Sequence, residues 1–291
     1  MKELILLVGP AGAGKTTIAL SEYPTFTRIS QDEQGKEGHL KAFKEALERG
    51  ENIVVDRMGF SKEQRARYIA PAKELGYTTK IVVLHVPSKV CMERMLKREN
   101  HPTITTEKSA GSALNTFFTK YEKPTQDESD TLLFVDYHPA GHKPKAIWCD
   151  LDNSLCKTSH RDHFLQSKPK DWKSFFSNCD KDELVIPVYE IIHKFDTHEY
   201  DSHDIVYCSG RPDTYRTMTQ AWLEEHNCPE GELFMRARND FRPDSTIKEI
   251  ILDFEVLPQY RVLFCIDDRD MVVRLLRSRG LTVLQPAYGD F

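Results

Sequence analysis

The chain has 291 residues, of which 40% are hydrophobic and 29% are charged, and its formal net charge is −5. This length predicts two domains of about 140 residues, each large enough to bury its own core. The charge excludes a protein that binds nucleic acid through a generally basic surface, so any such contact must come from a few lysines and arginines in a groove.

Strand-like and helical segments alternate through the first half of the chain. The short apolar run Leu4–Val8 precedes a glycine-rich loop, and a helix is expected from about Lys15. Further strands are expected at Arg28–Ser30, Ile53–Val55, Ile81–Leu84 and Leu132–Val135, with a helix over Lys62–Leu75. This alternation predicts a parallel sheet with helices on both faces.

Residues 136–145 contain two prolines and a glycine without periodicity, which is typical of a linker. The pattern then restarts, with strands expected at Ala146–Cys149, Ile205–Cys208, Val262–Ile266 and Thr282–Leu284, and helices at about Pro187–Phe195 and Asp213–His226. The predicted fold class is therefore α/β, with one domain over residues 1–140 and a second over 145–291.

The seven cysteines are scattered and form no CxxC pair, which favours free thiols in a reducing compartment. No apolar run is long enough to span a bilayer, and the N-terminal run lacks the pattern of a cleaved leader. We therefore expect a cytoplasmic protein that does not contact membranes.

The segment Gly9–Thr17 fits the pattern of a triphosphate-binding loop between a strand and a helix. Glycines such as Gly12 and Gly14 let the backbone amides turn inward as an anion-binding nest, and the helix N-terminus adds partial positive charge. Lys15 offers a cation to the β- and γ-phosphates, and Thr16 offers a hydroxyl to Mg²⁺. The expected ATP-binding residues are Gly9, Gly12, Gly14, Lys15, Thr16 and Thr17.

Candidates for the acceptor side of this site are less specific. Asp32 follows a short strand and suits an acid that orients the acceptor hydroxyl, but it also suits a solvated turn. Asp56 ends an apolar strand, as a magnesium-shell carboxylate or a capping residue would. Arg94 and Arg98, four residues apart on one predicted helix face, suit either a lid that neutralises the transferring phosphoryl group or a face paired with neighbouring glutamates.

The second half carries four short motifs in a fixed order. Asp150 and Asp152 follow a strand as an Asp-x-Asp pair, which resembles the first motif of the haloacid dehalogenase superfamily. The three motifs that follow are Ser209 with Arg211 after a strand, Lys248 opening a helical stretch, and Asp267, Asp268 and Arg269 after another strand. The order of the four motifs predicts a phosphatase that forms an aspartyl-phosphate.

Each residue type has a chemical reason in such a site. Asp150 attacks phosphorus, and Asp152 protonates the departing alkoxide and then activates water. Mg²⁺ and Lys248 offset the repulsion between a carboxylate and a phosphomonoester dianion. Asp267 and Asp268, with Asp150 and the Asp152 carbonyl, offer the hard oxygen ligands that Mg²⁺ prefers.

Essentially the whole chain resembles the bacteriophage-type polynucleotide kinase-phosphatase family, which heals broken ends in RNA repair. The segments that carry the resemblance beyond the motifs are Tyr215–Trp222, Arg236–Lys248 and Gly289–Phe291. The resemblance implies a 5′-hydroxyl polynucleotide kinase followed by a 3′-phosphatase. It implies kinase roles for Lys15, Thr16, Asp32 and a lid arginine, and phosphatase roles for Asp150, Asp152, Asp182, Ser209, Arg211, Arg236, Asp244, Lys248, Asp267, Asp268 and Arg269, of which Asp182 is the weaker match.

The chain departs from the family pattern at a few positions. Asn153 and Ser154 stand where the family usually has Gly-Thr, and Gly35 stands where the phage enzymes have an arginine. The stretch His101–Thr103 after the lid carries no second arginine. The segments Gln31–Gly35, Asp56–Arg57 and Gln64–Arg65 are more similar to eukaryotic end-healing kinases and tRNA-ligase-type kinase domains.

The leading hypothesis is a bifunctional enzyme that phosphorylates a 5′-hydroxyl end with ATP and removes a 3′-phosphate or opens a 2′,3′-cyclic phosphate. Its expected partners are RNA or DNA ends and a ligase that acts downstream, and the resemblance implies self-association. One alternative is a small-molecule kinase fused to a metabolite phosphatase. Another is a nucleic-acid-binding adaptor with a degenerate catalytic half, against which the complete acidic set with Lys248 argues.

Overall fold

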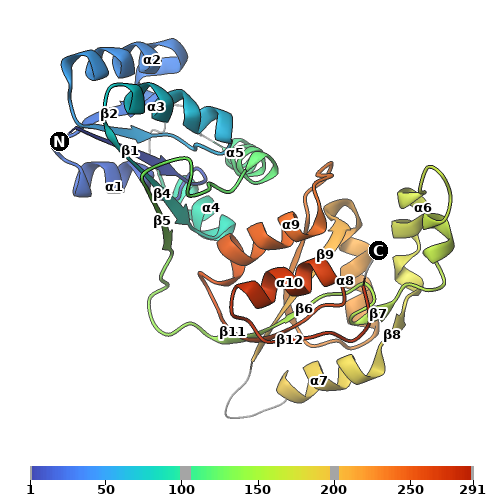
Figure 1. Ribbon diagram of the computed structural model, residues 1–291. Helices are drawn as coiled ribbons and strands as arrows, with labels where there is room; N and C mark the ends of the chain where they lie inside the picture. Colours follow the sequence, from blue (N-terminus) through green and yellow to red (C-terminus); the bar gives the residue numbers. More distant parts are fainter. Residues whose placement is uncertain (1, 99–105, 197–202, 290–291) are drawn as a thin grey trace. The chain divides into compact units, whose positions relative to one another are not determined.

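The computed structural model describes residues 2–98, 106–196 and 203–289 (Figure 1). The chain divides into two compact units, Met1–His138 and Pro139–Phe291, which are described separately. The segment His101–Thr103 and the final residues Asp290 and Phe291 lie outside the described residues. None of the described helices combines the length and the apolar character needed to cross a bilayer.

The first unit is built on a parallel sheet in the order β2-β3-β1-β4-β5. Its strands are β1 (Glu3–Val8), β2 (Thr27–Ser30), β3 (Ile53–Asp56), β4 (Thr78–His85) and β5 (Thr131–Asp136). Its helices are α1 (Lys15–Glu22), α2 (Gln31–Arg49), α3 (Lys62–Glu74), α4 (Ser88–Leu96) and α5 (Glu107–Lys120). The predicted alternation of strands and helices is confirmed. The apolar runs of β1, β3 and β4 are buried, whereas Leu133, Phe134 and Val135 of the edge strand β5 are exposed.

Side chains alternate across this sheet, so each strand feeds two apolar layers. On one face, Ile5 and Leu7 of β1 pack with buried residues of α1, α4 and α5. Leu4 and Leu6 point to the other face and are equally buried, and α2 and α3 contact the strands there. Both faces of the sheet are therefore covered, as a parallel sheet requires.

The second unit has its own parallel sheet in the order β10-β9-β6-β11-β12. Its strands are β6 (Lys145–Cys149), β9 (Asp204–Pro212), β10 (Gly231–Arg236), β11 (Arg261–Ile266) and β12 (Val283–Leu284). Helices α9 (Asp244–Ile251) and α10 (Asp270–Ser278) pack on one face, and α7 (Ile186–Asp196) and α8 (Arg216–Glu225) pack on the other. The predicted second α/β domain is confirmed.

A small additional layer follows β6. It consists of the antiparallel pair β7 (Cys156–Lys157) and β8 (Glu183–Leu184), the short helix α6 (Trp172–Ser177), and the 3₁₀ turns η1 (Asp162–Leu165) and η2 (Cys179–Lys181). Figure 1 shows α6 beyond the end of the sheet rather than against either face. No pattern in the sequence predicts this layer.

Three local predictions need correction. Helix α4 ends at Leu96, so Arg98 lies beyond the helix and shares no helix face with Arg94. Helix α9 begins at Asp244, four residues before Lys248, so Lys248 lies inside the helix rather than at its start. Strand β9 continues through the Ser-Gly-Arg motif to Pro212 and pairs with the unpredicted strand β10.

Candidate active sites

The loop between β1 and α1 has the backbone of an anion-binding nest. Gly12 and Gly14 adopt φ values of 82° and 97°, which are costly for residues with a side chain. A Cβ at Gly12 would lie 2.4 Å from the carbonyl oxygen of Cys91, so the packing of α4 against the loop also requires glycine. The loop therefore has the shape that a triphosphate group fits, with the N-terminus of α1 beneath it.

Lys15 is buried and caps its own loop. Its Nζ donates hydrogen bonds to the carbonyl oxygens of Gly9 at 3.0 Å and Pro10 at 2.7 Å. Burial lowers the pKa of Lys15 to about 8, although the nearby Asp56 carboxylate opposes this shift. The negative charge of an incoming phosphate would therefore raise the pKa of Lys15 and favour its ammonium form.

Asp56 accepts hydrogen bonds from Thr16, whose hydroxyl is the predicted Mg²⁺ ligand, and from Arg28, which was predicted only as a strand residue. Thr16 Oγ1 donates to Asp56 Oδ2 at 2.8 Å, and Arg28 Nη1 donates to the same oxygen at 2.9 Å. Arg28 also pairs with Glu33 in the first turn of α2. No motif marks Arg28, so only the pairing of β2 with β3 brings it to the site.

A cavity of about 590 Å³ opens beside this cluster. It is lined by Thr16, Thr17, Leu20, Ser21, Arg28, Ser30, Asp32, Glu33 and Arg98. The predicted acid Asp32 and the lid candidate Arg98 thus meet at one cavity. Arg94 lies elsewhere, with Nη1 at 3.5 Å from the carbonyl oxygens of Gly12 and Ala13 in the triphosphate loop. The two lid candidates therefore face different parts of the site.

The pKa of Lys15 leads to a testable pH dependence. A bound triphosphate favours the ammonium form, so above about pH 8 binding must take up a proton. We expect the ATP dissociation constant to rise about tenfold between pH 7 and pH 9, since one pH unit above a pKa costs a factor of ten. Isothermal titration calorimetry in buffers of different ionisation enthalpy measures both the affinity and the proton uptake.

Two variants control this measurement. Lys15→Met should bind ATP weakly and without proton uptake, whereas Lys89→Met on the exposed side of α4 should keep the wild-type dependence. A wild-type affinity that stays constant from pH 7 to pH 9 would contradict the lowered pKa of Lys15.

In the second unit, three acids meet at the carboxyl ends of adjacent strands. Asp150 follows β6, and Asp267 and Asp268 follow β11; all three are buried, and ligand oxygens from the three lie within 4.8 Å of one another. Lys248 Nζ donates to Asp150 Oδ1 at 2.7 Å and to Asp267 Oδ2 at 2.8 Å. The predicted nucleophile, lysine and acidic pair are thus brought together.

This cluster holds more negative charge than its lysine offsets. Burial raises the pKa of Asp150 well above its ordinary value, and Asp267 and Asp268 add to the shift while Lys248 opposes it. Burial, with Asp267 second, raises the pKa of Asp268 to about 7. Among the described residues, the buried Asp268 Oδ2 has no hydrogen-bond partner. Three hard oxygen donors with an unused ligand atom fit a divalent cation such as Mg²⁺.

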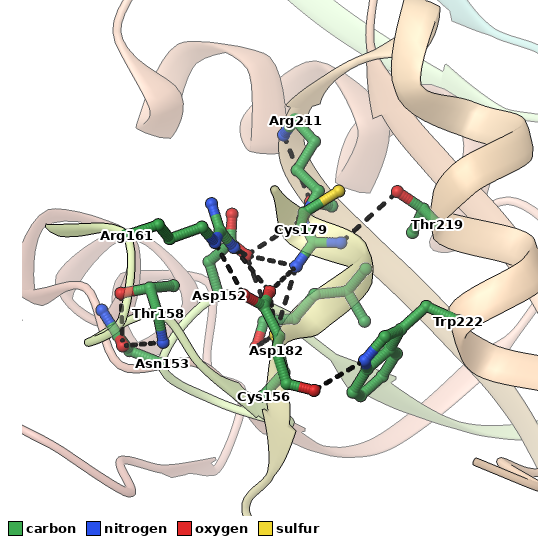
Figure 2. A network of polar contacts seen from close by, with 12 residues as sticks. Asp152, Asn153, Cys156, Thr158, Arg161, Cys179, Asp182, Arg211, Thr219 and Trp222 are labelled. Carbon is green, nitrogen blue, oxygen red and sulfur yellow. Dashed lines mark hydrogen bonds and ion pairs between the residues drawn. The ribbon is translucent and has the colours of Figure 1, made fainter. Parts of the chain in front are cut away.

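Asp152 lies in a second network, held between two buried arginines (Figure 2). Arg161 Nη2 donates to Asp152 Oδ1 at 2.6 Å, and Arg211 donates to it through Nη2 at 2.5 Å and Nε at 2.9 Å. Both arginines also bind Asp182, at 2.6 and 2.7 Å. The Asp152 side chain is 24% exposed, whereas those of Arg161, Arg211 and Asp182 are fully buried, so Asp152 is the member that a substrate can reach.

The network contains two guanidinium groups, of Arg161 and Arg211, and two carboxylates, of Asp152 and Asp182, so its formal charges cancel. Burial opposes ionisation of Asp152, but Arg211 and Arg161 outweigh burial and hold the pKa of this carboxyl well below its ordinary value. Arg211, which the family resemblance implies is a phosphatase residue, contacts both Asp152 and Asp182. Arg161 was not predicted because it sits in no motif, and Asp182 was the weaker match to the family because its spacing to Pro187 differs.

The remaining predicted residues surround these two clusters. A Cβ at Gly210 would lie 2.4 Å from Asp244 Oδ1, so the second motif packs directly on the start of α9. Arg236 donates to the carbonyl oxygen of Gly210 at 2.9 Å and to Asp244 Oδ1 at 3.1 Å. Arg269 Nη1 lies 3.6 Å from Asp244 Oδ2, and Ser209 Oγ accepts from the amide of Arg211 at 3.2 Å.

Asn153, which stands where the family usually has glycine, fits the backbone conformation of the loop. Asn153 adopts φ 61°, a left-handed conformation that glycine takes most easily and asparagine tolerates better than most residues. Its Oδ1 accepts hydrogen bonds from the Thr158 amide at 3.2 Å and from Thr158 Oγ1 at 2.9 Å. Within the described structure, the hydroxyl of Ser154, the next residue of the same loop, is buried without a hydrogen-bond partner.

Comparison with known proteins matches both units. Residues 144–291 match the family described as polynucleotide kinase PNKP phosphatase domain, and residues 4–124 match an AAA domain family. A putative bifunctional polynucleotide kinase/RNA ligase of Autographa californica nuclear polyhedrosis virus is 24% identical over 306 aligned positions, covering 94% of this chain and 41% of that protein. Transcription factor bHLH140 of Arabidopsis thaliana is 29% identical over 165 residues, covering 52% of this chain and 17% of that protein.

This chain thus spans less than half the length of these curated relatives. Among solved structures, a chain of the Pnkp1/Rnl/Hen1 RNA repair complex is 22% identical with a TM-score of 0.45, covering 100% of this chain and 97% of that one. Kti12 of Chaetomium thermophilum, in complex with ADP-AlF3, is 15% identical with a TM-score of 0.35, covering 45% of this chain and 88% of that one. Through residues 144–291, the chain belongs to the family of polynucleotide kinase PNKP phosphatase domains.

Proposed function

We propose that this chain is a bifunctional enzyme that heals nucleic-acid ends. In this proposal, residues 1–140 use ATP to phosphorylate a 5′-hydroxyl polynucleotide end, and residues 145–291 remove a 3′-phosphate or open a 2′,3′-cyclic phosphate. The observation that carries the proposal is the presence of two chemically complete phosphate sites on one chain. One is the triphosphate loop with the adjoining cavity that contains Asp32, and the other is the buried cluster of three acids around Lys248.

For the kinase, the positions of the side chains suggest a division of roles. Lys15 and Arg94 lie at the triphosphate loop, where they would hold the donor and offset charge on the transferring group. Asp32 lies in the adjoining cavity and would accept the proton of the 5′-hydroxyl, with Arg98 beside it. Thr16 would hold Mg²⁺, which neutralises charge on the phosphates when bound.

For the phosphatase, Asp150 would attack phosphorus and form an acyl-phosphate, while the bond to the sugar oxygen breaks. Asp152 would give a proton to the departing alkoxide, then take one from the water that cleaves the acyl-phosphate. Lys248 would hold the phosphate beside Asp150. A divalent cation at Asp150, Asp267 and Asp268 would offset the repulsion between carboxylate and phosphate.

The two arginines on Asp152 add a condition to this cycle. They keep Asp152 ionised, so it is ready to accept a proton from water in the second step. The first step needs a protonated carboxyl, so an arriving phosphate dianion must draw at least one guanidinium away from Asp152. We therefore assign Arg161 and Arg211 to a positioning role that changes during the reaction.

The products of the two reactions, a 5′-phosphate and a 3′-hydroxyl, are the ends that a nucleic-acid ligase joins. We therefore infer that a ligase is the downstream partner, with RNA or DNA ends as the substrate. Self-association, which the family resemblance implies, and a cytoplasmic location, which the scattered cysteines favour, belong to the same proposal.

The experiment that tests the proposal uses matched RNA and DNA oligonucleotides with a 5′-hydroxyl and either a 3′-phosphate or a 2′,3′-cyclic phosphate. With ATP and Mg²⁺, the wild-type chain should convert both ends, as mass spectrometry of the intact oligonucleotide would show. A parallel screen covers nucleosides and sugar phosphates. Turnover of these small molecules without turnover of any oligonucleotide would instead support a metabolite kinase fused to a metabolite phosphatase.

A further inference from the structure

An aromatic surface, exposed at Trp172 and half-buried at Phe176 and Tyr215, lies beside the phosphatase site on α6 and the neighbouring turn η3 (Asp213–Tyr215). We call it the aromatic platform and define it as Trp172, Phe176 and Tyr215 with the flanking Lys170 and Lys173. The Trp172 side chain is 47% exposed, although its ring is among the largest apolar groups in the chain. Single exposed apolar residues are common, so the argument depends on what surrounds this ring.

The platform is continuous with the Asp152 network. The Arg161 guanidinium, which binds Asp152 at 2.6 Å, lies 4.1 Å from the centroid of the buried Phe175 ring. Phe175 makes edge contacts with Trp172 at 6.0 Å and with Phe176 at 5.2 Å between ring centroids. A chain of packed rings therefore runs from the catalytic arginine network to the exposed surface of α6.

A second connection holds the other side of the platform. Phe176 contacts Tyr215, with ring centroids 5.6 Å apart, and Tyr215 follows closely after Arg211 at the end of β9. Trp172 stacks on Phe176 at 5.8 Å with an interplanar angle of 19°. The platform is thus held in place from both arginines that bind Asp152.

The aromatic platform is surrounded by positive charge, although the chain as a whole is negatively charged. Lys168, Lys170 and Lys173 are all exposed around Trp172, whereas the net charge of the chain is −5. Lys170 Nζ lies 5.5 Å from the Trp172 ring centroid, and Asp171, the acid among these lysines, caps α6 by accepting from the Ser174 amide. Stacking rings with interleaved cations are the chemistry that binds single-stranded nucleic acid without reading its sequence.

We propose that the aromatic platform binds the unpaired nucleotides next to the 3′-phosphate of a single-stranded polynucleotide. A base stacks on Trp172, and backbone phosphates pair with Lys170 and Lys173, while the terminal phosphate reaches Asp150. This inference rests on the proposed phosphatase function and names its substrate as an unpaired strand rather than a small phosphomonoester.

The test compares two substrates of the 3′-phosphatase reaction, a 3′-phosphorylated single-stranded oligonucleotide and the aliphatic monoester glycerol 2-phosphate. Trp172→Ala should lower kcat/KM for the oligonucleotide about tenfold relative to that for the monoester, because one base stack is lost. Trp172→Phe should retain most of the activity. Ile186→Ala, which truncates a 57% exposed apolar residue of α7, should change neither value.

Direct binding separates this inference from the proposed function. Fluorescence anisotropy of a labelled 3′-phosphorylated oligonucleotide needs no turnover and should show weaker binding for Trp172→Ala. The double variant Lys170→Gln/Lys173→Gln should bind with a reduced salt dependence. Equal losses on both substrates, or unchanged oligonucleotide binding by Trp172→Ala, would overturn the platform. Binding by the wild type without any release of 3′-phosphate would overturn the proposed phosphatase instead.

Discussion

Replacing Asp150 with asparagine is expected to lower the rate of 3′-phosphate removal by at least about 10³-fold, because an amide cannot form the acyl-phosphate. Asparagine keeps the size of the side chain, and Lys248 keeps its hydrogen bond to Asp267 at 2.8 Å, so the buried cluster loses one charge but no packing. The measurement is the release of inorganic phosphate from a 3′-phosphorylated oligonucleotide at saturating Mg²⁺.

Two comparisons make this result specific. Asp150→Asn should leave ATP-dependent 5′-phosphorylation unchanged, because the triphosphate loop lies in the other compact unit. Asp180→Asn, an amide substitution at an exposed acid in η2, should leave both reactions unchanged. Phosphate release by Asp150→Asn within tenfold of wild type would place the nucleophile elsewhere.

Arg161→Met is expected to lower the free energy of unfolding of the second unit by about 3–5 kcal/mol, because it leaves the carboxylates of Asp152 and Asp182 sharing the single guanidinium of Arg211, with one buried negative charge in excess. Arg161 binds Asp182 through Nε at 2.7 Å and Nη2 at 2.6 Å, and neither side chain is exposed. Urea titration, followed by a signal from the second unit, measures the change.

The matched control is an exposed pair from the same layer. Lys157 and Glu183 are 3.7 Å apart with side chains 54% and 81% exposed, so Lys157→Met should cost less than about 1 kcal/mol. Adding Asp182→Asn to Arg161→Met should restore part of the lost stability, since the stranded charge is removed. Equal costs for Arg161→Met and Lys157→Met would show that the buried pair contributes no more than a surface pair.

Much of this fold could be predicted from the sequence, because most of its parallel strands are short apolar runs. Ile53–Val55 is fully buried, Val262–Ile266 is half-buried over its first three residues, and both lie in strands where the patterns place them. The acids at the ends of such strands could also be anticipated, since the carboxyl ends of parallel strands gather at one edge of a sheet. Asp150 and Asp267 meet there for that reason.

Other parts of the fold and of the site depend on contacts between distant residues, which no local sequence pattern reveals. Arg161 and Asp182 lie 21 positions apart in irregular chain, and only the folding of the layer around α6 brings them to Asp152. Strand β10 begins at Gly231, where a Cβ would lie 2.2 Å from the Ile205 carbonyl oxygen, so tight packing rather than β-propensity selects its first residue. The separation of Arg94 from Arg98 depends on where α4 ends, which helical spacing alone does not reveal.

The missing side chain at Gly210 has a consequence for how this site can vary. Because the Asp244 carboxylate fills the space that a Cβ would need, the second motif and the helix that carries Lys248 are fixed against each other like two parts of one joint. A side chain at position 210 would displace this carboxylate, which lies 3.5 Å from Lys248 Nζ and 3.1 Å from Arg236 Nη2. A substitution in the second motif would therefore act on the lysine beside the nucleophile, although position 210 itself carries no functional group.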